Sequence, residues 1–182
     1  MEHLTPEQLQ AGLAEIKASP NDEGRLEMIV IRPATDERRV LESCQLTTER
    51  GCEGDDWREG YLDTGVTPDP QTQLTLMNAR CAQLISGGRE RWPLAGDQLF
   101  VDLDLSEANL GVGQRLAIGD TVVEITAEPH TGCSKFAARF GVDAVKFVNM
   151  GEGARHRLRG VHAMVIEEGE VHQGDLIRKV DH

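Results

Sequence analysis

The sequence RLAIGDTVVEI at residues 115–125 decides the fold class of this chain. Aliphatic and β-branched residues fill both halves of the stretch, which favours two short strands. Gly119 and Asp120 stand between the halves, and a two-residue turn of this composition is typical of a β-hairpin. The stretch therefore predicts two antiparallel strands in direct succession.

Further short strands are predicted on both sides of this hairpin. They are expected at residues 25–31, 38–46, 73–77, 99–103, 161–166 and 176–180. Helices are expected between Asn78 and Gly87, from Cys133 to Phe140, and in residues 143–149. Many short strands punctuated by glycine favour a closed barrel over layers of parallel strands. The fold prediction is mainly β, a distorted closed β-barrel with a few inserted helices and an N-terminal helix.

The N-terminal segment carries clear start signals for that helix. Residues 5–8 read TPEQ, which offers a capping box with proline at the first helical position. Three aliphatic residues then recur at spacings of four and three, forming a stripe that must dock on the rest of the protein: Leu9, Leu13 and Ile16. We expect residues 1–20 to form a helical appendage and residues 25–182 to form the barrel domain.

Composition restricts the classes of partner. The chain has 182 residues, with 31 acidic and 19 basic side chains and a net charge of −12, which argues against binding to nucleic acid or an anionic membrane surface. No apolar run approaches the roughly 20 residues that span a bilayer, and no export pattern is visible. We therefore expect a cytoplasmic protein with four free thiols, at Cys44, Cys52, Cys81 and Cys133.

Residues 129–141, PHTGCSKFAARFG, carry the most definite chemistry in the sequence. Cys133 is expected in the first turn of a helix, where the positive end of the helix dipole favours thiolate over thiol. His130, Lys135 and Arg139 add positive or hydrogen-bonding groups close to it in the sequence. The pattern predicts a reactive or metal-ligating sulfur, because the thiolate is the form that attacks and ligates.

Four stretches, taken in order, resemble the MOSC family, which is named for the C-terminal domain of molybdenum cofactor sulfurase. They are residues 51–55 (GCEGD), residues 73–77 (QLTLM), residues 95–99 (AGDQL) followed by 109–119, and the Cys133 stretch followed by 159–161 and 169–171. The resemblance covers about residues 42–180. It implies a small stand-alone β-barrel protein in which Cys133 is the functional sulfur.

The resemblance implies one of two mechanisms. In the first, a partner cysteine desulfurase, which holds the pyridoxal phosphate, hands a sulfane sulfur to Cys133, and the chain acts as a sulfur carrier or sulfurtransferase. In the second, Cys133 ligates the molybdenum of a pterin cofactor and a redox partner supports reduction of N-hydroxylated compounds. A soft thiolate suits both. His130, Lys135 and Arg139 would then orient or bind the anionic cofactor.

The sequence departs from the family at one point and leaves other interpretations open. Residues 54–58 lack the histidine that MOSC members usually place there. A noncatalytic barrel that binds a small molecule or protein, with Cys133 packed for structure, is one alternative. A thiol redox protein that pairs Cys133 with Cys52 is another, because Cys52 lies in a segment, residues 49–70, that we expect to be a long surface loop able to approach Cys133.

Two further patterns are weaker. His130 and Cys133 have the spacing of half a zinc site, but no second pair of ligands has matching spacing, so structural zinc is disfavoured. Arg155, Arg157 and Arg159 alternate, which on a strand would place all three on one side. That side would form either an anion-binding wall or an ordinary exposed surface.

Overall fold

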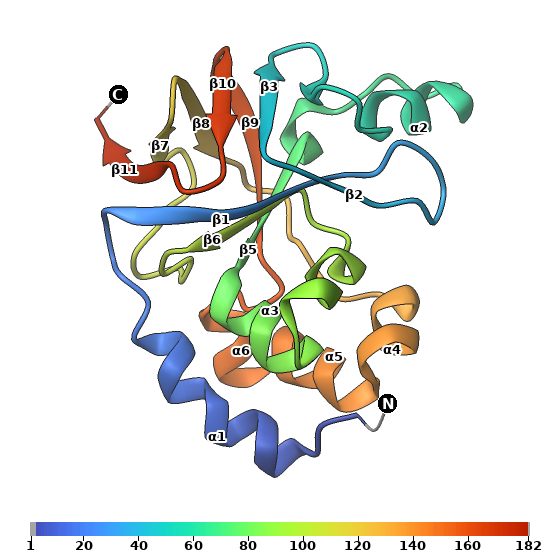
Figure 1. The fold of residues 1–182 in the computed structure, drawn as a ribbon. Coiled ribbons are helices and arrows are strands. Elements are labelled where there is room, and N and C mark those ends of the chain that lie inside the picture. Colours follow the sequence, from blue (N-terminus) through green and yellow to red (C-terminus); the bar gives the residue numbers. More distant parts are fainter. Residues whose placement is uncertain (1–2, 182) are drawn as a thin grey trace.

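The computed structural model, which describes residues 3–181, contains a closed β-barrel (Figure 1). Seven strands form the ring, because β1 pairs with β6 on one side and with β11 on the other. In ring order they are β1 (Gly24–Ile31), β6 (Leu99–Asp102), β5 (Leu74–Asn78), β9 (Val161–Glu167), β8 (Thr121–Ile125), β7 (Arg115–Ile118) and β11 (Leu176–Val180). Only β5 and β6 pair in parallel among these described strands. The predicted distorted barrel is confirmed.

The hairpin predicted at residues 115–125 is present as β7 and β8. Ile118 pairs with Thr121 across the Gly119 and Asp120 turn, and the register continues to Arg115 opposite Glu124. Burial alternates along both strands, as expected where one face points into the barrel.

The strand predicted at residues 38–46 is wrong, because two strands in different sheets occupy it. β2 (Arg39–Leu41) extends the main sheet beside β1, whereas β3 (Ser43–Thr47) joins a small sheet between β10 (Gly169–His172) and β4 (Gly51–Cys52). The change of sheet occurs at Glu42, whose carbonyl oxygen accepts a hydrogen bond from the backbone N–H of Gln173.

The long surface loop predicted at residues 49–70 is also wrong, since this segment contains β4 and the helix α2 (Trp57–Asp63). A buried carboxylate explains why this segment is folded. Asp55 accepts hydrogen bonds from the Arg32 guanidinium at 2.6 and 2.9 Å and from the backbone N–H of Trp57 at 3.2 Å. This pairing fixes the start of α2 against the end of β1, which local composition could not indicate.

Two hydrophobic cores hold the fold together. The first fills the barrel with residues such as Leu26, Leu76 and Leu99. The second lies between the outer face of β1, β5 and β6 and a group of helices gathered on one side of the barrel in Figure 1. These helices are α1 (Pro6–Lys17), α3 (Ala79–Ser86), α4 (Ser134–Phe140), α5 (Val142–Asn149) and α6 (Gly151–Arg155). β5 is buried along its whole length because it has core on both faces.

The N-terminal helix has the predicted capping box. Gln8 Oε1 accepts from the Thr5 backbone N–H at 2.9 Å, and Thr5 Oγ1 accepts from that of Gln8 at 3.4 Å. Its apolar stripe is buried against the second core. The division into an appendage of residues 1–20 and a domain of residues 25–182 stays a prediction. Among residues 3–181 no helix has the length and apolar character needed to cross a bilayer.

Candidate functional site

Cys133 is exposed and stands immediately before α4, at its N-cap position. The backbone N–H groups of Phe136 and Lys135 are directed at the sulfur and lower the pKa of the Cys133 thiol, and the nearby positive charge of Arg159 lowers it further. The sulfur does not reach hydrogen-bonding geometry with the first turn. The sequence argument from the helix start therefore describes the electrostatics of this thiol correctly.

The peptide before Cys133 is held in place by Asn149, at the end of α5. Asn149 Oδ1 accepts from the Gly132 N–H at 2.9 Å, and Asn149 Nδ2 donates to the Gly132 carbonyl at 3.1 Å. A side-chain amide that satisfies both polar groups of one peptide fixes its orientation. The position of Cys133 therefore depends on α5 as well as on α4.

The segment from Leu94 to Gln98 organises the positive charge around this site. Arg139 donates to the Leu94 carbonyl at 2.8 Å, Arg159 to the Ala95 carbonyl at 3.0 Å, and Arg32 to the Gly96 carbonyl at 3.3 Å. Three guanidinium groups from distant parts of the chain thus converge on three consecutive carbonyl oxygens. The segment runs from the end of a 3₁₀ helix (Arg89–Ala95) to the start of β6.

Asp97 forms a buried charged network on the same segment. Its carboxylate is fully buried and accepts two bonds from Arg159, at 2.7 and 2.9 Å, and one from His130 Nε2 at 2.8 Å. Burial opposes ionisation, but the Arg159 charge and the His130 contact hold the pKa of Asp97 well below its usual range. The Arg159 guanidinium also lies over the Phe136 ring, 5.0 Å from its centroid, which ties the network to the first turn of α4.

His130 and His162 form a pair of imidazole rings with centroids 4.5 Å apart. Burial lowers the pKa of His130 from 6.5 to about 4, and burial also lowers the pKa of His162. Both rings are therefore neutral at neutral pH. Since an ionised Asp97 only accepts hydrogen bonds, neutral His130 must carry its proton on Nε2.

Arg32, Arg38 and Arg139 form a second basic group, which we call the arginine cluster. Burial, together with the positive charges of Arg139 and Arg32, lowers the pKa of Arg38. The Nε atom of Arg38 is buried and has no hydrogen-bond partner within residues 3–181, and no carboxylate in that range pairs with its guanidinium. Arg32 pairs with Asp55, and Arg139 lies 3.5 Å from exposed Asp36. Arg38 thus has no direct ion pair among the described residues, although the charges of Asp56 and Asp36 act on it.

The predicted site residues are only partly brought together. His130 contacts Asp97, and Arg139 belongs to the arginine cluster. The Lys135 side chain is exposed and makes no ion pair among the described residues, so its visible contribution to Cys133 is its backbone N–H. Sequence reasoning missed the roles of Asp97 and Arg38. The motifs at residues 95–99 and 159–161 gave a signal for Asp97 and its partner, whereas nothing in the sequence marked Arg38.

The other three cysteines are buried. Cys44 and Cys52 lie in the barrel core and their thiols are hydrogen-bonding neighbours, while burial raises the pKa of Cys81 to about 12. Cys52 therefore lies beside Cys44 inside the protein, whereas Cys133 is at the surface. No group of three or more Cys, His, Asp or Glu side chains within residues 3–181 is arranged to hold a metal ion.

The MOSC domain family matches residues 89–178, a segment that contains the Asp97 network and Cys133. The chain contains a MOSC domain. The matched segment also includes Arg139, whereas Arg32 and Arg38 lie before it. The arginine cluster is therefore assembled partly from outside the matched MOSC segment.

Solved structures share the fold of this MOSC protein. A hypothetical protein superposes with a TM-score of 0.61 and 18% identity over 88% of this chain and 69% of that one. YuaD from Bacillus subtilis superposes with a TM-score of 0.60 and 15% identity, over 87% of this chain and 96% of YuaD. YiiM from Escherichia coli superposes with a TM-score of 0.57 and 19% identity, over 87% of this chain and 70% of YiiM. At these identities the likeness concerns the fold alone. No curated protein matches the sequence.

Proposed function

We propose that this MOSC protein acts through Cys133 as a thiolate that handles the molybdenum cofactor or sulfur. The single observation that carries the proposal is an exposed thiol whose pKa is lowered by the amides of the following helix and by the charge of buried Arg159. A surface thiolate is available to a partner or a metal, which a buried thiol is not. The MOSC family supplies the association with the molybdenum cofactor.

The residues present fit a phosphate-bearing pterin cofactor. Arg38 has a buried Nε without a hydrogen-bond partner and makes no direct ion pair within residues 3–181, although the charges of Asp56 and Asp36 act on it. A phosphate would supply that partner, because arginine binds phosphate through paired donors. Cys133 would ligate the molybdenum, and Arg38 and Arg139 would hold the phosphate. When bound, such a cofactor supplies two-electron redox chemistry, which in family relatives reduces N-hydroxylated compounds.

The protein's own residues then have defined tasks. Asn149 holds the peptide before Cys133, and the first-turn amides favour the ionised form of the sulfur. Arg159, fixed by Asp97, adds positive charge near the sulfur from inside the protein. Together these groups hold the sulfur in one place and lower the pKa of its thiol.

A sulfur-carrier function is the second candidate, and the exposure of Cys133 favours it. A desulfurase that holds pyridoxal phosphate would place a sulfane sulfur on Cys133, which would then pass it to an acceptor. A noncatalytic barrel in which Cys133 only packs receives less support, because Cys133 is exposed rather than buried. The arginine cluster distinguishes the first two candidates, since a carrier has no need of a phosphate site.

The test is metal and pterin analysis of the protein purified from a molybdenum-replete host. The cofactor function predicts molybdenum and pterin in the wild type, loss of molybdenum in Cys133→Ala, and weaker pterin retention in Arg38→Gln. Cys81→Ala is the matched control, because it removes a buried thiol that cannot reach a bound cofactor and should keep the metal.

The carrier function predicts a different result in the same preparations. Molybdenum would be absent, and mass spectrometry after incubation with a cysteine desulfurase and cysteine would find one extra sulfur on Cys133. If wild-type protein binds neither molybdenum nor sulfur, and Cys133 is alkylated no faster than an unfolded thiol, both candidates fail.

A further inference from the structure

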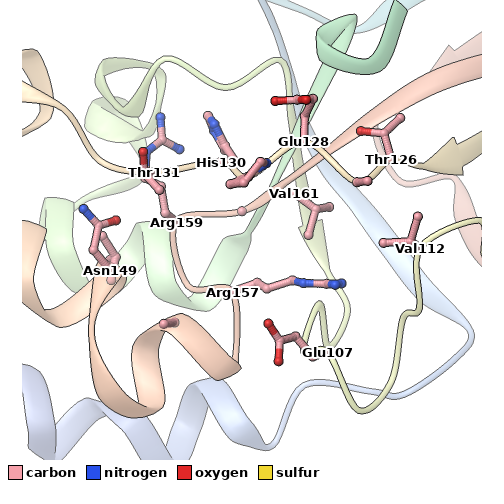
Figure 2. A pocket seen from close by; sticks show the side chains of 15 residues that line it. Glu107, Val112, Thr126, Glu128, His130, Thr131, Asn149, Arg157, Arg159 and Val161 are labelled. Atoms are coloured by element: carbon pink, nitrogen blue, oxygen red, sulfur yellow. The ribbon is translucent and has the colours of Figure 1, made fainter.

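A separate cavity lies on the other side of the loop that carries Cys133. It has a volume of about 250 Å³ and is walled by residues 126–131, by the turn at residues 157–161, and by Glu107 and Val112. Figure 2 shows the side chains that line it. Cys133 and the arginine cluster do not line this cavity, although His130, Asn149 and Arg159 of the site described above do.

Three charged side chains in the lining form no ion pair within residues 3–181. They are Arg157, Glu107 and Glu128. Arg157 donates one hydrogen bond to the Leu110 carbonyl, at 2.6 Å, which leaves the rest of its guanidinium unused. In Figure 2 the Arg157 side chain reaches across the cavity, and the two glutamates lie on opposite sides of it. Charges of both signs therefore face one space without neutralising each other.

The turn that carries Arg157 has an unfavourable backbone conformation. The three alternating arginines do not share a strand, since Arg155 ends α6 and Arg157 lies in a turn with φ of 47°. That left-handed conformation is uncommon for a residue with a side chain like arginine. Gly160, at φ of 111°, closes the turn where any Cβ would lie 2.3 Å from the Leu76 carbonyl oxygen. Such conformations gather at sites where function holds them.

The remaining polar groups of the lining do not change this balance of charge. The Arg159 charge is neutralised by Asp97, and its buried Nε has no partner. His130 contributes a neutral ring, and valine side chains such as Val112 and Val161 supply an apolar wall. The unpaired groups thus consist of one cation and two carboxylates around a small, partly apolar space.

A ligand with a single charge does not suit this arrangement. A simple carboxylate would meet Arg157 but would also lie near two carboxylates, and a simple amine would be repelled by Arg157. A molecule with both charges satisfies all three groups. The volume is below the about 300–1,000 Å³ of pockets for drug-sized ligands, so the ligand must be small.

We infer that this cavity binds a zwitterionic ligand of amino-acid size, with its carboxylate on Arg157 and its ammonium group between Glu107 and Glu128. The inference does not depend on the proposed function of Cys133. The two sites share a wall, because His130 and Thr131 line the cavity while the same loop continues into Cys133.

The test titrates the intact protein with a panel of the L-amino acids and measures binding by calorimetry and by amide NMR shifts. The best-binding amino acid is then compared with its two single-charge analogues, the acid without the amino group and the amine without the carboxylate. We expect at least about tenfold weaker binding for each analogue, since each leaves a charge of the cavity unpaired.

Arg157→Asn is the decisive variant, because asparagine tolerates a left-handed backbone and should preserve the turn. It should weaken binding by at least about tenfold. The matched control, Arg155→Asn, removes the same charge from a neighbouring exposed position and should bind as the wild type does. Unfolding midpoints of both variants establish that they are folded. The inference is overturned if no amino acid binds, if the acid analogue binds equally well, or if Arg157→Asn binds unchanged.

Discussion

The neutral state of His130 makes a quantitative prediction about stability in acid. Burial lowers the pKa of His130 from 6.5 to about 4, so between these values the unfolded chain binds a proton that the folded protein does not. The stabilisation is therefore complete above pH 6.5 and is lost as the pH falls toward 4. Each pH unit in this window costs about 1.4 kcal/mol of unfolding free energy. Between pH 7 and pH 5, His130 alone should remove about 2 kcal/mol.

The assay is urea denaturation of wild type and His130→Gln at pH 7 and pH 5. Glutamine can place an N–H near the position of His130 Nε2 and keep the bond to Asp97, but it does not titrate. The loss of unfolding free energy between the two pH values should be smaller in the variant by about 2 kcal/mol. Because burial also lowers the pKa of His162, a residual loss of the same sign is expected in both proteins.

The unfolding free energies of both proteins at pH 7 are the control, because they separate the stability lost through the substitution itself from the stability lost through the change of pH. An equal loss in wild type and His130→Gln would refute the reasoning, whatever the absolute stability of the variant at pH 7.

Three further outcomes are expected. Iodoacetamide at pH 7 should modify Cys133 at least about tenfold faster than Cys81, because Cys133 is exposed with a lowered pKa and Cys81 is buried. Mass spectrometry measures the two rates, and equal rates would contradict this. Gly160→Ala should lose more than about 3 kcal/mol in urea, since its Cβ meets a backbone oxygen at 2.3 Å, whereas Gly60→Ala has open space and should lose none. Asn149→Ala removes both hydrogen bonds to the peptide before Cys133, so it should cost about 1–3 kcal/mol of unfolding free energy; an unchanged denaturation midpoint would oppose that role.

The elements that sequence could predict are those with local causes. The hairpin of β7 and β8 follows from a two-residue turn between aliphatic runs, and α1 follows from its capping box and apolar stripe. The same is true of Cys133, whose acidity comes from the helix that directly follows it. In each case the deciding contacts lie within a few residues along the chain.

The features that sequence missed depend on long-range partners. α2 begins where it does because Asp55 pairs with Arg32, 23 residues earlier. Arg38 becomes a candidate for anion binding only because Arg32 and Arg139 lie near it. Arg139 is on α4, about a hundred residues later in the chain. The alternating arginines form no strand, because the chain turns through a left-handed residue at Arg157.

The charge state of His130 also restricts what chemistry is available at Cys133. With a pKa of about 4, His130 has no proton to give at neutral pH beyond the Nε2 proton that it donates to Asp97. Its effect on Cys133 passes through Asp97, which fixes Arg159, and Arg159 lies over Phe136 in the first turn of α4. His130 is thus a positioning residue in this network and not a general acid. Any proton needed at Cys133 must then come from solvent, from a substrate or from a partner.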